Sequence, residues 1–253
     1  MLLTIDIGNS RTVAGVFAAG TGPKAEPDPL WAWPADASVD AEKLQQTLAD
    51  RPIRRVYIAS VVPVATRLWQ AAVRDVLNTT PVVIGAEHGE LVGLTPQVAA
   101  TVGADRIANA VAARTLYGRN CIVVDFGTAT NLDIVRQGQF VGGAISPGLE
   151  ISAAALFATA ARLQPVQLAV PESVVGHDTT TAIQAGLLYG EAGKVDALVR
   201  ATMQELNMNA LMTTVIATGG LSPLMEPLCR QVNCLDPNLT LKGLHHLAQA
   251  PSR

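Results

Sequence analysis

The sequence predicts an α/β protein built from two similar halves, on three observations. Short apolar runs typical of buried strands alternate with segments of helical periodicity along the 253 residues. The stretch "LLTIDIGNSRTVAGVF" (residues 2–17) has a counterpart in "CIVVDFGTATNLDIV" (residues 121–135). A strand-like run that ends in small residues also occurs twice, as "VYIASVVP" (residues 56–63) and "VIATGGLSP" (residues 215–223). Repeated patterns in this order indicate a duplicated structure.

In both copies of the first repeat, an apolar strand reaches an aspartate and then a glycine. Apolar runs separated by such a turn predict a β-hairpin in each half. The repeat restarts at Cys121, so we expect one domain over residues 1–118 and a second over residues 119–253. Aligned without a gap, the repeat pairs Asp6 with Asp125, Gly8 with Gly127, Asn9 with Thr128, Val13 with Leu132 and Val16 with Val135.

Apolar and β-branched composition marks the individual strands. Residues 122–124 and 215–217 are continuously apolar, as expected of central strands covered on both faces. Residues 20–40 are rich in Pro, Gly and Ala and predict a loop with a short strand near Leu30 to Trp33. The other expected strands are Leu2–Ile7, Val13–Ala18, Arg55–Ala59, Pro81–Ile84, Cys121–Phe126, Asn131–Val135, Gln139–Ala144 and Thr214–Ala217.

Two segments show the periodicity of helices. Residues 104–117 place Ile107 and Val111 on one side with alanines between them, and residues 191–206 carry an apolar stripe. A third stretch, residues 144–161, is apolar and rich in small side chains, which suits close helix packing in a dimer interface or within a domain core. Helices that alternate with strands in this way are typical of α/β proteins.

Composition excludes several classes of function. Hydrophobic residues make up 49% and charged residues 15% of the chain, enough for a sizeable core. The net charge of −3 and the pI near 5.8 give no electrostatic reason to expect a nucleic acid or an acidic membrane as partner. No apolar run approaches the ~18 residues of a membrane span, and the three cysteines have neither disulfide nor metal spacing. We therefore expect a soluble protein of the cytoplasm.

The two Asp-x-Gly turns have the features of a polyphosphate site. Glycine lets the backbone approach a ligand closely, and turn N–H groups can hold phosphate oxygens. The aspartates need a cation between themselves and phosphate, either Mg²⁺ held through waters or a monovalent ion. The alternative, an aspartate that only stabilises a tight turn, is disfavoured by the second copy. Side chains able to assist are Asn9, Ser10, Thr12, Thr128 and Thr130.

Other residues point to a nucleotide and to proton transfer. Gly219-Gly220 follows a strand and would let an adenine or ribose lie on bare backbone. Walker and GxGxxG signatures are absent from the sequence, which disfavours a P-loop or Rossmann site. Asp105 and Arg106 open a predicted helix, whose N-terminus favours anions. Asp105 is therefore either a general base for a hydroxyl or a helix-terminal residue that bonds backbone N–H groups.

Beyond these features, the sequence resembles the type III pantothenate kinase family, in the superfamily of acetate kinase, sugar kinases, Hsp70 and actin. The resemblance extends nearly end to end, and its most specific parts are "GADRIANAVAA" (residues 103–113) and "GGAISPGLEIS" (residues 142–152). It implies two ribonuclease-H-like domains with the nucleotide site in the cleft between them. It also implies a homodimer that phosphorylates pantothenate from ATP, with Mg²⁺ and with K⁺ or NH₄⁺, in the first step of coenzyme A biosynthesis.

Carried over by motif, the resemblance implies a role for individual residues. Asp105 would accept the proton, and Asp125 would bind the monovalent cation. The chemistry of the Asp-x-Gly turns also places Mg²⁺ at Asp6, held through water. The same chemistry adds the glycines Gly127, Gly219 and Gly220 to the ATP contacts. Implied pantothenate contacts are Gly103, Ala104, Asp105 and Arg106, with either Thr179 or Thr180. Implied ATP contacts are Asp6, Ile7, Gly8, Asn9, Ser10, Arg11, Thr12, Val13 and Thr128.

The segment before residue 103 departs from the family pattern. "GLTPQVAATVGADR" lacks the tyrosine and the Asn-Pro pair common there, so the lid of the pantothenate pocket differs. A kinase for another small hydroxy acid is one alternative function, and an ATP-binding accessory regulator of the same family is another. The joint presence of Asp6, Asp105, Arg106 and Asp125 favours an active kinase. An actin- or Hsp70-like ATPase needs further subdomains, for which this chain has no room.

Overall fold

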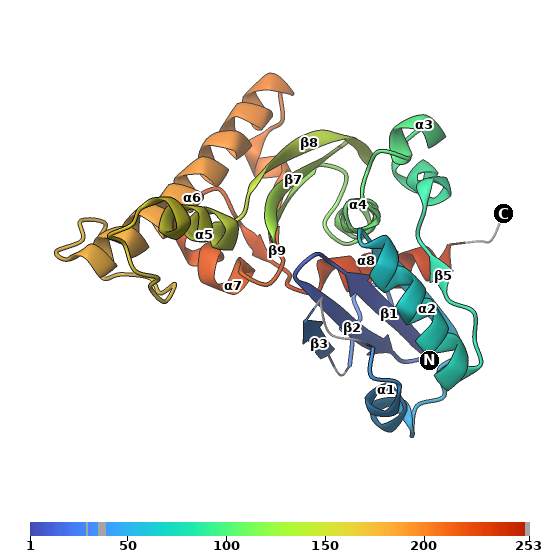
Figure 1. The fold of residues 1–253 in the computed structure, drawn as a ribbon. Coiled ribbons are helices and arrows are strands. Elements are labelled where there is room, and N and C mark those ends of the chain that lie inside the picture. Colours follow the sequence, from blue (N-terminus) through green and yellow to red (C-terminus); the bar gives the residue numbers. More distant parts are fainter. Residues whose placement is uncertain (29, 35–38, 251–253) are drawn as a thin grey trace. The chain divides into compact units, whose positions relative to one another are not determined.

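The computed structural model describes residues 1–28, 30–34 and 39–250, which form two compact units (Figure 1). The first unit comprises residues 1–119, 138–140 and 238 onward, and the second comprises residues 120–137 and 141–237. The second unit begins where the repeat restarts. The C-terminal residues, however, belong to the first unit, so the units differ from the continuous segments expected from the repeat.

Each unit contains a five-stranded mixed sheet, and the two sheets have the same strand order. This order is β3-β2-β1-β4-β5 in the first unit and β8-β7-β6-β9-β10 in the second. In both units the first two strands are antiparallel, and the central strand is parallel to the fourth. The duplication expected from the sequence is therefore confirmed in the sheets. The strands are β1 Leu2–Ile7, β2 Arg11–Phe17, β3 Leu30–Pro34, β4 Arg55–Ser60, β5 Val82–Val83, β6 Cys121–Phe126, β7 Ala129–Arg136, β8 Gln139–Pro147, β9 Thr214–Thr218 and β10 Cys234–Leu235.

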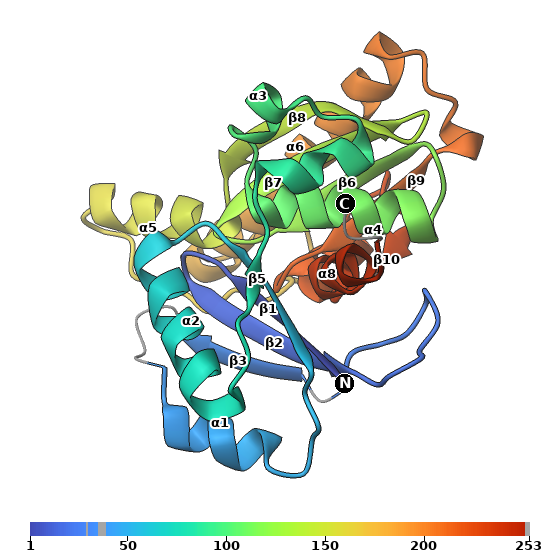
Figure 2. The same ribbon diagram turned by 90° about the vertical axis from the view of Figure 1, so that its right-hand side faces the viewer.

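Helices cover both faces of the first sheet. Leu44 of α1 and Trp69 of α2 belong to one apolar cluster with Ile5 of β1. On the other face α8 packs against β1 and lies beside α4 (Figure 2). Gly243 of α8 comes so close to α4 that a Cβ there would collide with the carbonyl oxygen of Ala108. The helices of this unit are α1 Ala41–Leu48, α2 Pro63–Leu77, α3 Pro96–Ala99, α4 Ala104–Leu116 and α8 Leu239–Gln249, with a 3₁₀ segment at Ala86–Val92.

The second unit is built around α6, a helix of 27 residues. Leu188 and Val195 of this helix share an apolar cluster with Ile122 and Leu132 of the sheet. Among the described residues, no helix combines the length and the apolar character needed to span a membrane. The helices are α5 Leu149–Thr159, α6 Thr179–Glu205 and α7 Ser222–Met225, with 3₁₀ segments at Ala210–Met212 and Glu226–Leu228.

Helix α6 begins well before the expected segment of residues 191–206. Asp178 caps it, because its carboxylate accepts the N–H of Thr181 at 2.8 Å while the Thr181 hydroxyl accepts the N–H of Asp178 at 3.2 Å. The first half of the helix contains Gly186 and Gly190, which are poor helix formers. The cap and the packing of this half on the sheet therefore decide where the helix starts, and neither is visible as an apolar stripe.

The two β-hairpins differ in the length of their turns. Residues 8–11 lie between the last paired residues of the first hairpin, and residues 127–129 lie between those of the second. The gapless alignment of the repeat is therefore wrong by one residue beyond the turn. Val16 corresponds to Ile134 rather than to Val135, and both Val16 and Ile134 point into the apolar core of their unit.

Candidate functional site

The first Asp-x-Gly turn lies at the carboxyl end of β1, the central strand of the first sheet. The N–H of Gly8 donates to the carbonyl oxygen of Arg11 at 3.0 Å and closes the turn. Asn9 is exposed at its tip, and Asp6 is half-buried just before it. Thr12 is 2% exposed, so its hydroxyl faces the interior while its backbone continues β2. The turn thus presents mainly backbone and residues 9–11 to solvent.

The GADR motif lies next to this turn within the first unit. Val61 follows β4, and its N–H donates to the carbonyl oxygen of Ile7 at 3.2 Å. A Cβ on Gly103 would lie 3.3 Å from Cγ1 of the same valine. Val61 therefore connects the end of β1, where Asp6 lies, with the start of α4, where Asp105 lies.

Asp105 stands in the first turn of α4, after the N-cap residue Gly103. Burial raises the pKa of the Asp105 carboxyl above its ordinary value, and the N–H and the charge of Arg106 act in the opposite direction. Oδ1 of Asp105 accepts that N–H at 2.9 Å. The Arg106 guanidinium lies 5.5 Å from the centre of the Phe140 ring, within the range of a cation–π contact. A partly desolvated carboxylate is suited to accept a proton, and its bond to a backbone N–H shows that Asp105 also acts at the helix terminus.

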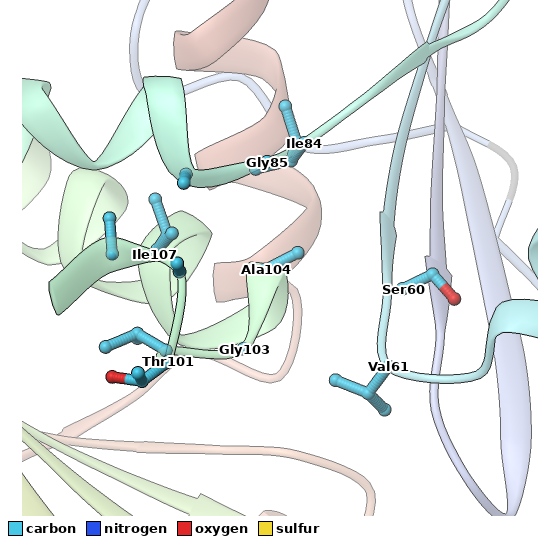
Figure 3. Close-up of a pocket in the computed structure, with 12 residues that line it drawn as sticks. Ser60, Val61, Ile84, Gly85, Thr101, Gly103, Ala104 and Ile107 are labelled. Carbon is cyan, nitrogen blue, oxygen red and sulfur yellow. The ribbon is translucent and has the colours of Figure 1, made fainter. Parts of the chain in front are cut away.

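A pocket of about 330 Å³ opens beside the GADR motif (Figure 3). Ser60 and Val61 line one side, and Thr101, Gly103 and Ala104 line the other. Apart from the two hydroxyl groups, the lining side chains are aliphatic or absent, and none of them is aromatic. Residues 99–104, which belong to the segment without a tyrosine, form much of this lining. The pocket is therefore lined by small and aliphatic side chains within the first unit, and backbone groups and the two hydroxyls supply its polar surface.

The second Asp-x-Gly turn lies at the carboxyl end of β6 and is enclosed more tightly. The N–H of Gly127 donates to the carbonyl oxygen of Ala129 at 3.1 Å, and the N–H of Gly148 donates to that of Thr128 at 3.2 Å. A Cβ on Gly148 would lie 2.5 Å from the Gly127 carbonyl oxygen and would also collide with that of Thr128. Only glycine fits there, so Pro147 and Gly148, at the end of β8, form one wall of the turn.

The Gly-Gly pair after β9 forms another wall of this turn. Gly219 has φ +86°, and a Cβ there would lie 2.7 Å from the carbonyl oxygen of Phe126 and would collide with Oδ1 of Asp125. The hydroxyl of Ser222 donates to the Gly219 carbonyl at 2.6 Å and fixes the following turn. The second unit thus brings together Asp125, the Gly127–Thr128 turn and the Gly219-Gly220 pair.

Two side-chain oxygens suited to a cation lie on the strands that pair with Asp125. Asp125 is paired with Asn131 of β7 and with Thr218 of β9, so the three side chains share one face of the sheet. Thr218 is 1% exposed, and its Oγ1 has no hydrogen-bond partner among the described residues; the same holds for Oδ1 of Asn131. Buried oxygens are rarely left without a partner. A carboxylate beside two such oxygens is the donor set that a hard cation prefers, so these residues fit a monovalent or divalent ion.

The structure tests the role predicted for Thr130 but does not distinguish Thr179 from Thr180. Thr130 was expected among the phosphate-binding side chains, and this is wrong: it is 1% exposed and donates its hydroxyl to Oε1 of Glu191 at 2.6 Å. Alternation along β7 puts it on the core face with Leu132. Thr179 and Thr180 are both exposed in the first turn of α6, so the choice between them stays open.

Sequence reasoning missed four residues of the second unit that lie around its turn. Asn131 and Thr218 become neighbours of Asp125 only through strand pairing. Glu191 and Lys194 form an ion pair of 2.7 Å on α6. A charged residue inside an apolar helix pattern was the available signal for Glu191, whereas nothing local distinguishes the other three.

Comparison with known proteins identifies the family. A model of the type III pantothenate kinase family matches residues 2–201. The chain belongs to this family. A type III pantothenate kinase of Parafrankia sp. strain EAN1pec is 42% identical over 96% of this chain and 96% of its own length. That of Moorella thermoacetica is 39% identical over 96% of this chain and 97% of its own length.

Solved structures of other proteins have a similar fold. Component A of (R)-2-hydroxyglutaryl-CoA dehydratase from Acidaminococcus fermentans has a TM-score of 0.54 at 11% identity, covering 98% of each chain. The ROK hexokinase of Thermus thermophilus has a TM-score of 0.50 at 12% identity, covering 97% of each chain. These likenesses agree with a fold of two duplicated α/β units.

Proposed function

We propose that this protein transfers the γ-phosphoryl group of ATP to the primary hydroxyl of pantothenate, the first step of coenzyme A biosynthesis. The observation that carries the proposal is the half-buried Asp105 at the start of α4, joined through Val61 to the first Asp-x-Gly turn. A base and a phosphate-binding turn on one unit are the minimum that phosphoryl transfer to an alcohol requires. The family membership given above supports the choice of acceptor.

In this proposal Asp105 accepts the proton of the pantothenate hydroxyl. The bond between the γ-phosphorus and the bridging oxygen breaks, the hydroxyl oxygen bonds to phosphorus, ADP leaves, and the proton ends on the carboxylate. The raised pKa of Asp105 favours this role, because a base with a higher pKa accepts the proton more readily. Arg106 would pair with the pantothenate carboxylate, next to Gly103 and Ala104, and Thr179 or Thr180 would complete the contacts.

The nucleotide would be held by the two turns. Backbone N–H groups of residues 6–13 and of Gly127 and Thr128 would bind phosphate oxygens, and Gly219-Gly220 would receive the base or ribose. Asp6 would hold Mg²⁺ through water, and the ion would neutralise charge that develops on the phosphates. Thr12 contributes through its backbone in this proposal, since its side chain is buried.

A monovalent cation, K⁺ or NH₄⁺, is proposed at Asp125. The support is the pair of buried oxygens on Thr218 and Asn131 that have no hydrogen-bond partner among the described residues. When bound, such an ion would offset the repulsion between Asp125 and the phosphates. Asp125 alone was assigned to it from the sequence; Asn131 and Thr218 are added from strand pairing.

We further propose a homodimer that acts in the cytoplasm. Residues 144–161 carry apolar side chains that the second unit leaves at its surface: Ile145 is 67% exposed at the end of β8, and Ile151 is 45% exposed on α5. An exposed apolar patch of this kind is typical of an interaction site, and a second copy of the chain is the proposed occupant. Light scattering of the purified protein at micromolar concentration would test this, since a fully active monomer contradicts it.

Phosphorylation assays on purified protein test the proposed function. ATP, Mg²⁺ and K⁺ are supplied with pantothenate or with a panel of small hydroxy acids, and ADP release is measured. Pantothenate should be turned over most efficiently. Preference for another hydroxy acid would transfer the same chemistry to that acceptor, and ATP binding without any turnover would favour the accessory-regulator alternative.

A further inference from the structure

Helix α6 carries an ion pair, Glu191 and Lys194, that contacts residues next to the second Asp-x-Gly turn. Glu191 is only 6% exposed, and its Oε2 lies 2.7 Å from Nζ of Lys194, whose side chain is 30% exposed. Burying a carboxylate is unfavourable unless it is paired and hydrogen-bonded. Both partners of Glu191 therefore matter: the ammonium of Lys194 on one oxygen and the hydroxyl of Thr130, 2.6 Å away, on the other.

Thr130 and Lys194, the two partners of Glu191, are each connected to the turn at residues 127–129 through different contacts. Thr130 is the residue at which pairing of β7 with β6 begins, directly after the turn. Lys194 donates to the carbonyl oxygen of Pro147 at 3.0 Å. The next residue, Gly148, donates its N–H to the carbonyl oxygen of Thr128 within the turn. One carboxylate thus anchors the strand that leaves the turn and, through Lys194, the segment that encloses it.

The two routes are also tied to each other. Ser146 donates its hydroxyl to the carbonyl oxygen of Thr130 at 3.2 Å, which joins the ends of β7 and β8. Gly148 is packed so closely against the turn that it has no room for a Cβ. A small shift of the Pro147 carbonyl therefore also moves Gly148 against the turn. The first turn has its own closing bond, from the N–H of Gly8 to the carbonyl oxygen of Arg11.

We propose that Glu191 is a positioning residue for nucleotide binding: through Thr130 and Lys194 it holds the Gly127–Thr128 turn in the shape that receives the phosphates of ATP. The inference rests on the proposed function in one respect, that this turn binds ATP. Removing the carboxylate leaves the Thr130 hydroxyl without its acceptor and Lys194 without its counter-charge, and the turn is then free to relax. Ground-state binding of ATP is affected, whereas the base at Asp105 is untouched.

The test compares MgATP affinity, by equilibrium titration without pantothenate, across a set of variants. Glu191→Ala and Thr130→Val should each raise the Kd for MgATP about tenfold, and Glu191→Gln should have a smaller effect because its amide oxygen still accepts the Thr130 hydroxyl. Thr130→Ser restores the hydroxyl and should bind like the parent. The double variant Glu191→Ala/Thr130→Val should bind MgATP no more weakly than Glu191→Ala, since the contact with Thr130 is already lost in Glu191→Ala.

Asp196 supplies a matched control on the same helix. It is 7% exposed and accepts the N–H groups of Arg230 and Gln231, at 3.1 and 2.9 Å, so it anchors a different segment. Asp196→Ala should lower the melting temperature as Glu191→Ala does, yet leave the Kd for MgATP unchanged. If Glu191→Ala does not fold, Glu191→Gln and the two Thr130 variants carry the comparison.

Equal MgATP affinity in the parent, Glu191→Ala and Thr130→Val overturns the inference, and so does an equal loss in Asp196→Ala. With pantothenate added, the KM for ATP should rise in Glu191→Ala while kcat stays within about threefold of the parent. A parent that binds MgATP but does not phosphorylate pantothenate contradicts the proposed function. The Kd comparison then still decides whether Glu191 positions the turn.

Discussion

The two units share one strand order but support their turns by different contacts. The first turn is closed by the Gly8 bond, and its tip is exposed. The second turn is enclosed by Gly148, by Gly219 and by the contacts of Glu191. Duplication therefore reproduces the sheet, which depends on backbone pairing, while the side chains that surround each turn are particular to one unit.

The chemistry divides between the units in the same way. The half-buried Asp105 lies near the first turn, and the oxygens of Asn131 and Thr218 lie beside Asp125 at the second. Under the proposed function, the first unit supplies the base and the second supplies the cation site. The predictions below test the contribution of each unit with single substitutions.

The largest effect is expected at the base of the first unit. Asp105→Asn keeps the shape and the bond to the Arg106 N–H but cannot take a proton from the acceptor. Loss of a general base lowers kcat by ~10²–10⁴, while MgATP should bind as in the parent. Steady-state kinetics and equilibrium titration check this. Turnover within a few-fold of the parent would leave Asp105 with its helix-terminal role alone.

Stimulation by monovalent ions should depend on the second unit. Asp125→Ala should abolish the increase in rate that K⁺ produces, and Thr218→Val should raise the K⁺ concentration for half-stimulation by about tenfold, the effect typical of groups around a metal ion. Asp6→Asn should impair MgATP binding yet keep a response to K⁺. Rates measured over a K⁺ series decide this, and an unchanged response of Asp125→Ala would put the ion elsewhere.

Added methyl groups test how tightly each turn is enclosed. Gly148→Ala should lower the free energy of unfolding by about 1–3 kcal/mol, because the Cβ overlaps two carbonyl oxygens of the second turn. In the first turn, a Cβ on Gly8 would lie 3.2 Å from the Arg11 carbonyl oxygen, so Gly8→Ala should have a smaller effect, within about 1 kcal/mol. Denaturant titration of both variants measures the difference; equal losses would contradict the unequal enclosure.

The smallest effect concerns acid stability of the first unit. Burial lowers the pKa of His245 on α8 to about 4, and the positive charges of His246 and Arg55 add to this. The folded protein therefore binds fewer protons than the unfolded chain between pH 4 and 6.5, so stability falls as the pH falls through this range. His245→Phe should show a weaker fall in melting temperature from pH 7 to pH 5 than the parent. A parallel fall in both proteins would assign the acid sensitivity to other groups.

Much of the fold follows from local pattern, and the exceptions have physical causes. Apolar runs located the strands of both sheets except β10, which has only two residues, Cys234 and Leu235. Periodicity located α4, but it missed the start of α6, where a capping box compensates for glycines. A gapless alignment misjudged the second hairpin because turn length is set by hydrogen bonding across the strands.

The sequence alone determined the duplication, the two Asp-x-Gly turns and the GADR motif, because each is a contiguous pattern whose chemistry depends on neighbouring residues. Only the tertiary structure decided which distant side chains meet these turns. Strand pairing places Thr218 next to Asp125, and the packing of α6 brings Glu191 within hydrogen-bonding distance of Thr130. Such contacts join residues far apart in the chain, where local spacing carries no information about distance in space. Burial has the same origin, since Asp105 acquires its raised pKa from the elements that cover it.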